Sequence, residues 1–159
     1  CPYRPYFGPD YRRILFAGIN LNGSEGGLTA IADLVDKAKK YLGEHKYLIF
    51  KSKSYGGSPF YYYVPLLAYL YNLYYSGKPL VKNYTQITFE QVIEGFRYCA
   101  LTNLIKCSVA SADRRSTPSK AMYRNCINKF TQELKLIDHQ VLVVFTLFAI
   151  LLLITLFIK

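Results

Sequence analysis

The hydrophobic positions of the chain alternate between short, fully apolar runs and longer segments with helical spacing. The apolar runs at residues 14–17, 99–105 and 141–145 predict buried strands, because continuous runs of this length are typical of parallel sheets. The run "YLIF" at 47–50 predicts a further short strand. Strands separated by helical segments indicate an α/β layered fold.

Four segments between these runs predict helices. Apolar residues recur every three or four positions over 28–42, and Gly43 is a plausible helix stop. An aromatic-rich segment within 51–77 and the segment 87–96 predict two more helices. The fourth is expected to begin with a hydroxyl cap at Thr117 followed by Pro118. Its apolar stripe would consist of Tyr123, Ile127, Phe130, Leu134 and Ile137.

The C-terminal residues form an uncharged apolar run. Residues 141–158 comprise 18 apolar residues or threonines, and a membrane-spanning helix needs about 17–25. The run could be a membrane anchor, a core strand followed by a buried helix, or the product of a disrupted reading frame. Because a core strand is expected at 141–145, we predict a domain over 1–145 and a separate apolar tail over 146–159.

Composition narrows the class of partner. The 159 residues carry a formal net charge of +10, which favours a polyanion such as nucleic acid, or an anionic membrane surface, as the partner; DNA is the partner we expect. The same lysines and arginines could simply keep an apolar protein in solution. No secretory signal leads the chain, so we expect an intracellular, cytoplasmic monomer; anchoring to a membrane by the tail is the alternative.

Three stretches give the chain a family likeness. They are "GINLN" (18–22), "LTNLIKCS" (101–108) and "NCINKFTQELKLIDHQVLVVF" (125–145). In this order they resemble the uracil-DNA glycosylase superfamily, particularly its iron–sulfur-containing branch. The resemblance implies a three-layer, doubly wound and mostly parallel sheet flanked by helices. It also implies hydrolysis of the N-glycosidic bond of uracil or another deaminated base in DNA.

The resemblance assigns roles to residues whose local chemistry leaves alternatives open. Asn20 would orient the attacking water, although Asn is also a favoured turn residue. Asn103 would read the base, since an amide both donates and accepts hydrogen bonds; a buried amide bonded to the backbone is the alternative. Phe60 would stack on the base or pack in the core. Phosphates would be bound by Lys106, Arg114, Arg115 and Lys120.

The cysteines match part of a cluster-binding set. Cys107 and Cys126 are similar in position to two ligands of a 4Fe–4S cluster in the iron–sulfur branch, and Cys1 could be a third. A cluster needs four thiolates, so the resemblance implies a further cysteine upstream of Cys1. Buried free cysteines are the competing interpretation.

One family motif has no counterpart. A histidine-containing loop that stabilises the leaving base would follow Phe145, whereas His139 precedes the strand. We therefore expect a truncated or diverged glycosylase that is weakly active or inactive in this form. The two alternatives are a non-catalytic, basic nucleic-acid-binding relative and a small tail-anchored membrane protein.

Overall fold

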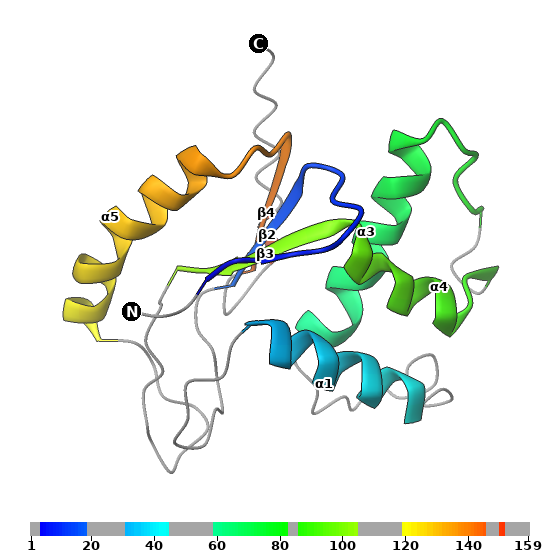
Figure 1. Cartoon of the computed structure of the whole chain (residues 1–159), viewed down its shortest axis with the longest axis horizontal. Helices are drawn as coiled ribbons and strands as arrows, with labels where there is room; N and C mark the ends of the chain where they lie inside the picture. The colour runs from blue at the N-terminus through cyan, green and yellow to red at the C-terminus, as the bar shows by residue number, and fades with distance from the viewer. Residues whose placement is uncertain are drawn as a thin grey trace. The chain divides into compact units, whose positions relative to one another are not determined.

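A small mixed sheet flanked by helices confirms the predicted α/β class (Figure 1). The computed structural model describes residues 4–18, 31–44, 59–82, 86–104, 119–145 and 150–151. The strand order is β1-β3-β2-β4-β5. The strands are β1 (Tyr6–Phe7), β2 (Ile14–Gly18), β3 (Cys99–Asn103), β4 (Val141–Phe145) and β5 (Ile150–Leu151).

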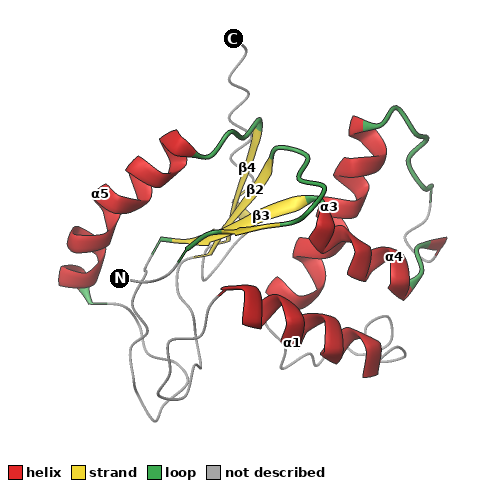
Figure 2. Cartoon of the chain, in the orientation of Figure 1, coloured by secondary structure: helices red, strands yellow, loops and turns green. Residues whose placement is uncertain are grey.

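The described helices follow the predicted segments closely (Figure 2). They are α1 (Ile31–Glu44), α3 (Pro59–Tyr75), α4 (Phe89–Glu94) and α5 (Lys120–Leu136), with a 3-10 turn η2 (Gly95–Arg97) directly after α4. Gly43 lies inside the last turn of α1 instead of ending it. The predicted strand at 47–50 lies outside the described residues.

The two central strands, β2 and β3, run parallel. Near their starts, the amide of Arg12 donates to the carbonyl of Tyr98 (2.8 Å), and at their ends the amide of Leu104 donates to the carbonyl of Gly18 (2.8 Å). The carboxyl ends of both strands therefore meet at one edge of the sheet.

The outer strands run in the opposite sense to their neighbours. The amides of Gly8 and Asp10 donate to the carbonyls of Cys99 and Arg97, at 2.9 and 3.0 Å, which is an antiparallel pattern between β1 and β3. Strand β5 pairs antiparallel with β4. The sheet is thus parallel at β2 and β3 and antiparallel toward its margins.

The chain divides into two compact units, and both draw on β2 and β3. One unit comprises Cys1–Tyr6, Leu15–Ile31 and Leu101–Lys159; the other comprises Phe7–Ile14 and Ala32–Ala100. We refer to them as the first and second unit.

In the first unit, β2, β3 and α5 supply the buried residues. Leu15, Phe16 and Leu101 are almost completely buried, as the apolar runs predict. On α5, Cys126 and Phe130 face inward, whereas Ile127 is 44% exposed. The predicted stripe is therefore wrong at Ile127, and Cys126, one position earlier, faces the core instead.

The cap of α5 also differs from the expectation. Ser119, not Thr117, is the N-cap, and its hydroxyl accepts a hydrogen bond from the amide of Met122 at 3.2 Å. The serine hydroxyl plays the capping role predicted for threonine, but for an amide group further along the chain. Lys120 thus becomes the first residue of the helix.

In the second unit, α3 packs against α4 and η2 (Figures 1 and 2). The contact is close because Gly95 lies against the backbone of Pro65: a Cβ at Gly95 would lie 1.8 Å from the Pro65 carbonyl oxygen. Helix α3 ends in a Schellman motif. The amide of Gly77 (φ 64°) donates to Tyr74 and that of Lys78 donates to Leu73.

The start of the apolar C-terminal run is a sheet strand. Residues 141–145 form β4, as predicted. Within the described ranges, no helix has both the length and the apolar character needed to cross a membrane.

Candidate functional site

The carboxyl ends of β2 and β3 bring two of the three motif stretches together. Gly18 begins "GINLN" and Leu104 lies within "LTNLIKCS", and the 2.8 Å backbone hydrogen bond between them joins segments that are 86 positions apart in the sequence. The chain leaves β2 toward β3 on one side, then leaves β3 toward β4 on the other side of β2. Ligands of open α/β sheets bind outside the carboxyl ends of the strands, which is the edge at which Gly18 and Leu104 lie.

Asn103 lies at this edge with its side chain against Gly18. It is buried, with 7% of its surface exposed. A Cβ added at Gly18 would lie 2.4 Å from the amide oxygen of Asn103, so a larger residue at position 18 would displace the amide. Glycine at this position therefore makes room for Asn103 at the strand ends.

The Asn103 amide is not committed to another side chain within the described residues. It makes no side-chain hydrogen bond to any residue in the described part of the chain. An amide offers one acceptor and one donor group side by side, and a buried amide ordinarily finds a partner. The geometry is thus suited to a planar ligand edge that presents a donor next to an acceptor.

Thr102 and α5 support the strand from its other face. Thr102 is buried, and its hydroxyl hydrogen-bonds to the carboxylate of Glu133 on α5. Because successive strand residues point to opposite faces, this contact anchors β3 without involving the side of the strand that carries Asn103.

Other predicted site residues are placed only in part. Phe60 lies in the first turn of α3, where its side chain is not described. Lys120 is exposed at the start of α5. The remaining predicted residues lie outside the described ranges: Asn20, Lys106, Arg114, Arg115, Cys1 and Cys107.

The described cysteines are free and buried. Cys126 lies on α5 and Cys99 at the start of β3. The thiol of Cys99 points to the carbonyl of Phe96 (3.9 Å), and burial raises the pKa of this thiol well above its usual range. Among the residues that the structure describes, no three histidines, cysteines or carboxylates are grouped to hold a metal ion.

His139 is occupied by the backbone of its own loop. Its Nδ1 lies 2.8 Å from the carbonyl oxygen of Ile137, between α5 and β4. Because a carbonyl only accepts, Nδ1 is the donor in this contact. This local contact explains the position of His139 without a role at the carboxyl ends of β2 and β3.

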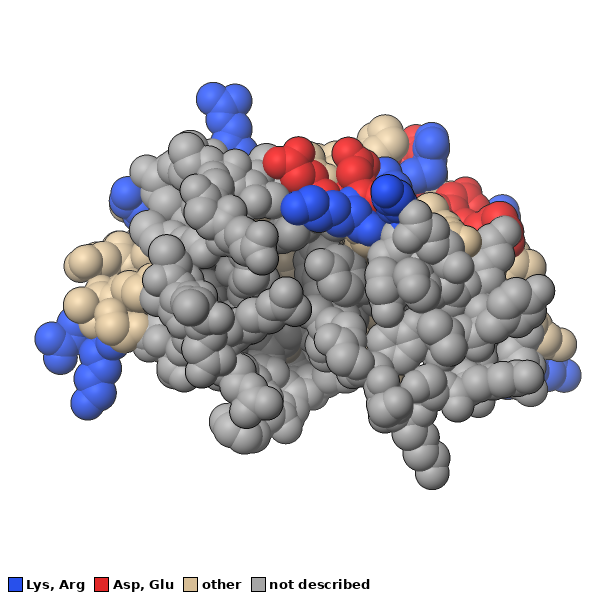
Figure 3. Space-filling view, turned by 90° about the horizontal axis from the view of Figure 1, so that it is seen from below, with Lys and Arg blue, Asp and Glu red and all other residues tan. Residues whose placement is uncertain are grey.

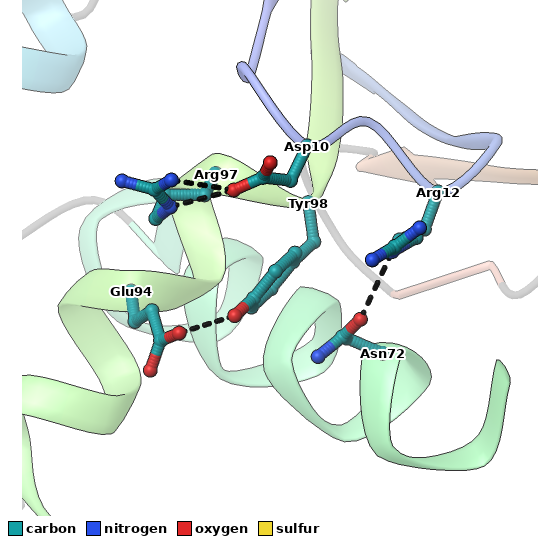
Figure 4. A network of polar contacts seen from close by, with 6 residues as sticks. All are labelled: Asp10, Arg12, Asn72, Glu94, Arg97 and Tyr98. Atoms are coloured by element: carbon teal, nitrogen blue, oxygen red, sulfur yellow. Dashed lines mark hydrogen bonds and ion pairs between the residues drawn. The ribbon is translucent and has the colours of Figure 1, made fainter. Parts of the chain in front are cut away.

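A polar network in the second unit escapes sequence reasoning (Figure 4). Arg97 forms an ion pair with Asp10, with nitrogen–oxygen distances of 2.6 and 2.8 Å. Nε of Arg12 donates to the Asn72 amide oxygen at 3.2 Å, and the Tyr98 hydroxyl donates to Glu94. The contacts of Arg97 with Asp10 and of Arg12 with Asn72 join positions 60 or more apart in the sequence. A local sequence pattern therefore cannot predict them.

Tyr98 is the titratable residue of this network whose pKa changes most. Burial raises the pKa of its hydroxyl to about 12, and the hydrogen bond to Glu94 and the charge of that carboxylate add to the effect. The protonated phenol is thus the form that the folded protein stabilises.

The described charges do not form a patch of one sign on the face shown in Figure 3. Acidic and basic side chains lie next to each other along one edge of that view. Most of the predicted phosphate-binding cations belong to residues outside the described ranges. The charge argument for DNA therefore continues to rest on the net charge of +10.

Comparison with known proteins adds no relative. No protein-family model matches the chain, and neither the curated proteins nor the solved structures gave a match.

Proposed function

We propose that the chain is a uracil-DNA glycosylase-like protein that binds an extruded base at the carboxyl ends of β2 and β3. The observation that carries the proposal is the packing of Asn103 against Gly18. It brings the expected base-reading residue to the start of the expected water-positioning motif. The fold proposed with it is the three-layer, doubly wound arrangement of this superfamily.

The chemistry of uracil suits the Asn103 amide. The pairing edge of uracil presents a carbonyl next to an N–H, so an amide can donate to the first and accept from the second. Cytosine presents an amino group and a bare ring nitrogen at the same positions. A site built for one hydrogen-bonding pattern rejects the other, because buried polar groups would be left unpaired.

The remaining steps need a water molecule and a stabilised leaving group. Asn20, two residues beyond the end of β2, would orient water through its carbonyl toward the sugar carbon. The bond to the base breaks as the bond to water forms, uracil leaves as an anion with the electron pair, and the attacking water loses its proton to solvent, which leaves an abasic sugar. Since an amide is a poor proton acceptor, catalysis would rely on positioning more than on general base action.

Contacts to DNA and to a cluster complete the proposal. Lys106, Arg114, Arg115 and Lys120 would contact phosphates, contributing affinity without sequence preference. Cys1, Cys107 and Cys126 would be three ligands of a 4Fe–4S cluster. Cys126 is buried on α5, as a cluster ligand would be, but the described residues assemble no ligand set, so we assign the cluster no step in the reaction.

The direct test is release of uracil from DNA. The purified chain should generate abasic sites in single- or double-stranded oligonucleotides that contain uracil, and none in matched thymine-containing oligonucleotides. Asn103→Ala and Asn20→Ala should each lower the rate. Asn128→Ala, which removes an exposed amide from α5, is the matched control and should leave the rate unchanged.

Gly18→Ala tests the geometry behind the proposal. The added methyl should displace the Asn103 amide and reduce uracil release about as strongly as Asn103→Ala does. Circular dichroism and urea unfolding would separate this effect from a loss of folding. Uracil release that is absent even after the histidine-containing loop of the superfamily is restored, or that is unaffected by either Asn103→Ala or Gly18→Ala, would contradict the proposal.

A further inference from the structure

Three tyrosines form an exposed aromatic surface at the end of α3, in the second unit. Tyr71, Tyr74 and Tyr75 share one helix face, because residues three and four apart are neighbours on a helix. The ring of Tyr71 lies 6.3 Å from that of Tyr74 and 6.1 Å from that of Tyr75, measured between centroids. We call this set the tyrosine platform.

The outer members of the platform are open to solvent. Tyr74 is 70% exposed and Tyr75 is 47% exposed. Single exposed apolar side chains are ordinary on protein surfaces, but adjacent exposed aromatic rings at one helix end are typical of surfaces that bind a partner.

One cation lies against the platform, and further cations lie near it in the sequence. The guanidinium of Arg12 lies over the ring of Tyr75, 5.7 Å from its centroid. Burial raises the pKa of the Tyr71 hydroxyl, and Tyr75 raises it further. The positive charge of Arg13 acts in the opposite direction, so Arg13 is near enough to influence Tyr71. Lys78 and Lys82 follow the helix and are exposed.

Acidic residues are missing from the segments that build this surface. Residues 11–13 and 59–82 contain four cations and no Asp or Glu. Among the described carboxylates nearby, Asp10 is paired with Arg97 and Glu94 accepts from Tyr98. The surface therefore combines exposed flat rings with an excess of positive charge.

We propose that the tyrosine platform, with Arg12, Lys78 and Lys82, binds single-stranded DNA by stacking unpaired bases and contacting phosphates. Aromatic rings beside cations are the two elements of sequence-tolerant single-strand binding. In duplex DNA the base faces are stacked on one another and cannot stack on the tyrosines. A duplex can therefore contact only the cations, through its phosphates. The choice of DNA over RNA rests on the proposed function. Single-strand binding by the platform is argued from its rings and cations and does not depend on that function.

The platform and the proposed base-reading site consist of different residues: the platform belongs to the second unit, and Asn103 belongs to the first. Stacking of bases on the tyrosines requires no contact with the Asn103 amide. The test can for this reason use DNA that contains no uracil.

The experiment measures binding of a fluorescently labelled oligothymidylate by anisotropy at several salt concentrations. The unmodified chain should bind it more tightly than a duplex of equal length. Tyr74→Ala should weaken binding roughly 5- to 150-fold, the range expected for one stacked base. Tyr74→Phe keeps the ring and should retain most of the affinity. The slope of the logarithm of affinity against the logarithm of salt concentration reports how many ions are released on binding. Lys78→Gln should lower that number by about one.

Matched controls come from exposed positions elsewhere. Leu136→Ala removes a large exposed apolar side chain from α5, and Lys37→Gln removes an exposed cation from α1; neither should change affinity. Because Tyr74 is largely exposed, its substitution should leave the circular dichroism spectrum intact.

Three outcomes would overturn the proposal. They are equal affinity of Tyr74→Ala and the unmodified chain, equal affinity for single strands and duplex, and tyrosine-dependent binding to vesicles of phosphatidylserine and phosphatidylcholine in preference to DNA. Tighter binding of oligouridylate than of oligothymidylate would overturn the choice of DNA. None of these results depends on uracil release, so failure here and failure of the glycosylase proposal are distinguishable.

Discussion

Individual polar residues in the buried parts of this protein are accounted for by specific contacts. Thr102 is bonded to Glu133, and Asn72 accepts from Arg12. Asn103 differs, because its amide faces Gly18 and has no hydrogen-bonding partner among the described side chains. For this reason Asn103 is the residue that we propose for base binding; the composition of "CALTNLI" alone could equally indicate a structural amide.

Tyr98 predicts a pH dependence of stability at the residue scale. Its pKa rises from 10.0 to about 12 on folding, so the contribution is complete below pH 10 and is lost as the pH rises toward 12. Tyr98→Phe should lower the free energy of unfolding at pH 8 by about 1.5–3 kcal/mol, the range for a hydrogen bond to a charged group, and should flatten its decline above pH 10.

Urea unfolding at several pH values measures both effects. Glu94→Gln is the companion variant, because it keeps an acceptor but removes the carboxylate charge that raises the pKa. It should make the decline above pH 10 shallower without abolishing it. An unchanged decline in Tyr98→Phe would show that other groups control stability in this range.

At the scale of elements, close backbone approach determines how the helices of the second unit pack. The contact between α3 and η2 depends on Gly95, whose missing side chain admits the Pro65 carbonyl. The hydrophobic pattern predicts both segments as helical. It contains nothing about their contact, because the decisive feature of Gly95 is an absent Cβ that meets a residue 30 positions away.

Gly95→Ala should therefore destabilise the protein. The new methyl would meet backbone atoms of Pro65, which cannot rotate away as a side chain could, so we expect a loss of about 3 kcal/mol, the upper part of the range for overpacking. Gly43→Ala is the control: it lies in α1, no described atom outside its own stretch of helix lies within 4 Å of the added methyl, and the change should be neutral or stabilising. Equal unfolding free energies for the two variants would refute this interpretation of Gly95.

At the scale of the whole molecule, β2 and β3 contribute residues to both compact units. Cys99 is completely buried at the start of β3, and its raised thiol pKa keeps it in the unreactive protonated form. Reaction of Cys99 with a thiol reagent should thus report the unfolding of this central strand.

We expect Cys99 to resist iodoacetamide in the folded protein and to become modified in step with the loss of secondary structure as urea increases. Mass spectrometry of the Cys99 peptide and circular dichroism, recorded over the same urea series, provide the two curves. Complete modification of all four cysteines at high urea is the control for the chemistry. Rapid modification of Cys99 in buffer would show that β3 opens without unfolding.

The sequence by itself determined the element types and most of their positions. Continuous apolar runs predicted β2, β3 and β4, and helical spacing predicted α1, α4 and α5, because these periods reflect local burial. The sequence pattern did not predict Ser119 as the cap of α5, because that depends on where the helix begins. Nor did it predict the exposure of Ile127, because that depends on which side of the helix is covered by the rest of the protein.

Only the tertiary structure decided which distant residues meet. The strand order, the adjacency of Gly18 and Asn103, the polar network of Figure 4 and the cations beside the tyrosine platform all join positions far apart in the chain. Such contacts depend on how the chain crosses the sheet between strands. Periodicity is a local property and carries no information about that path, so the site could be suspected from its motifs but assembled only in three dimensions.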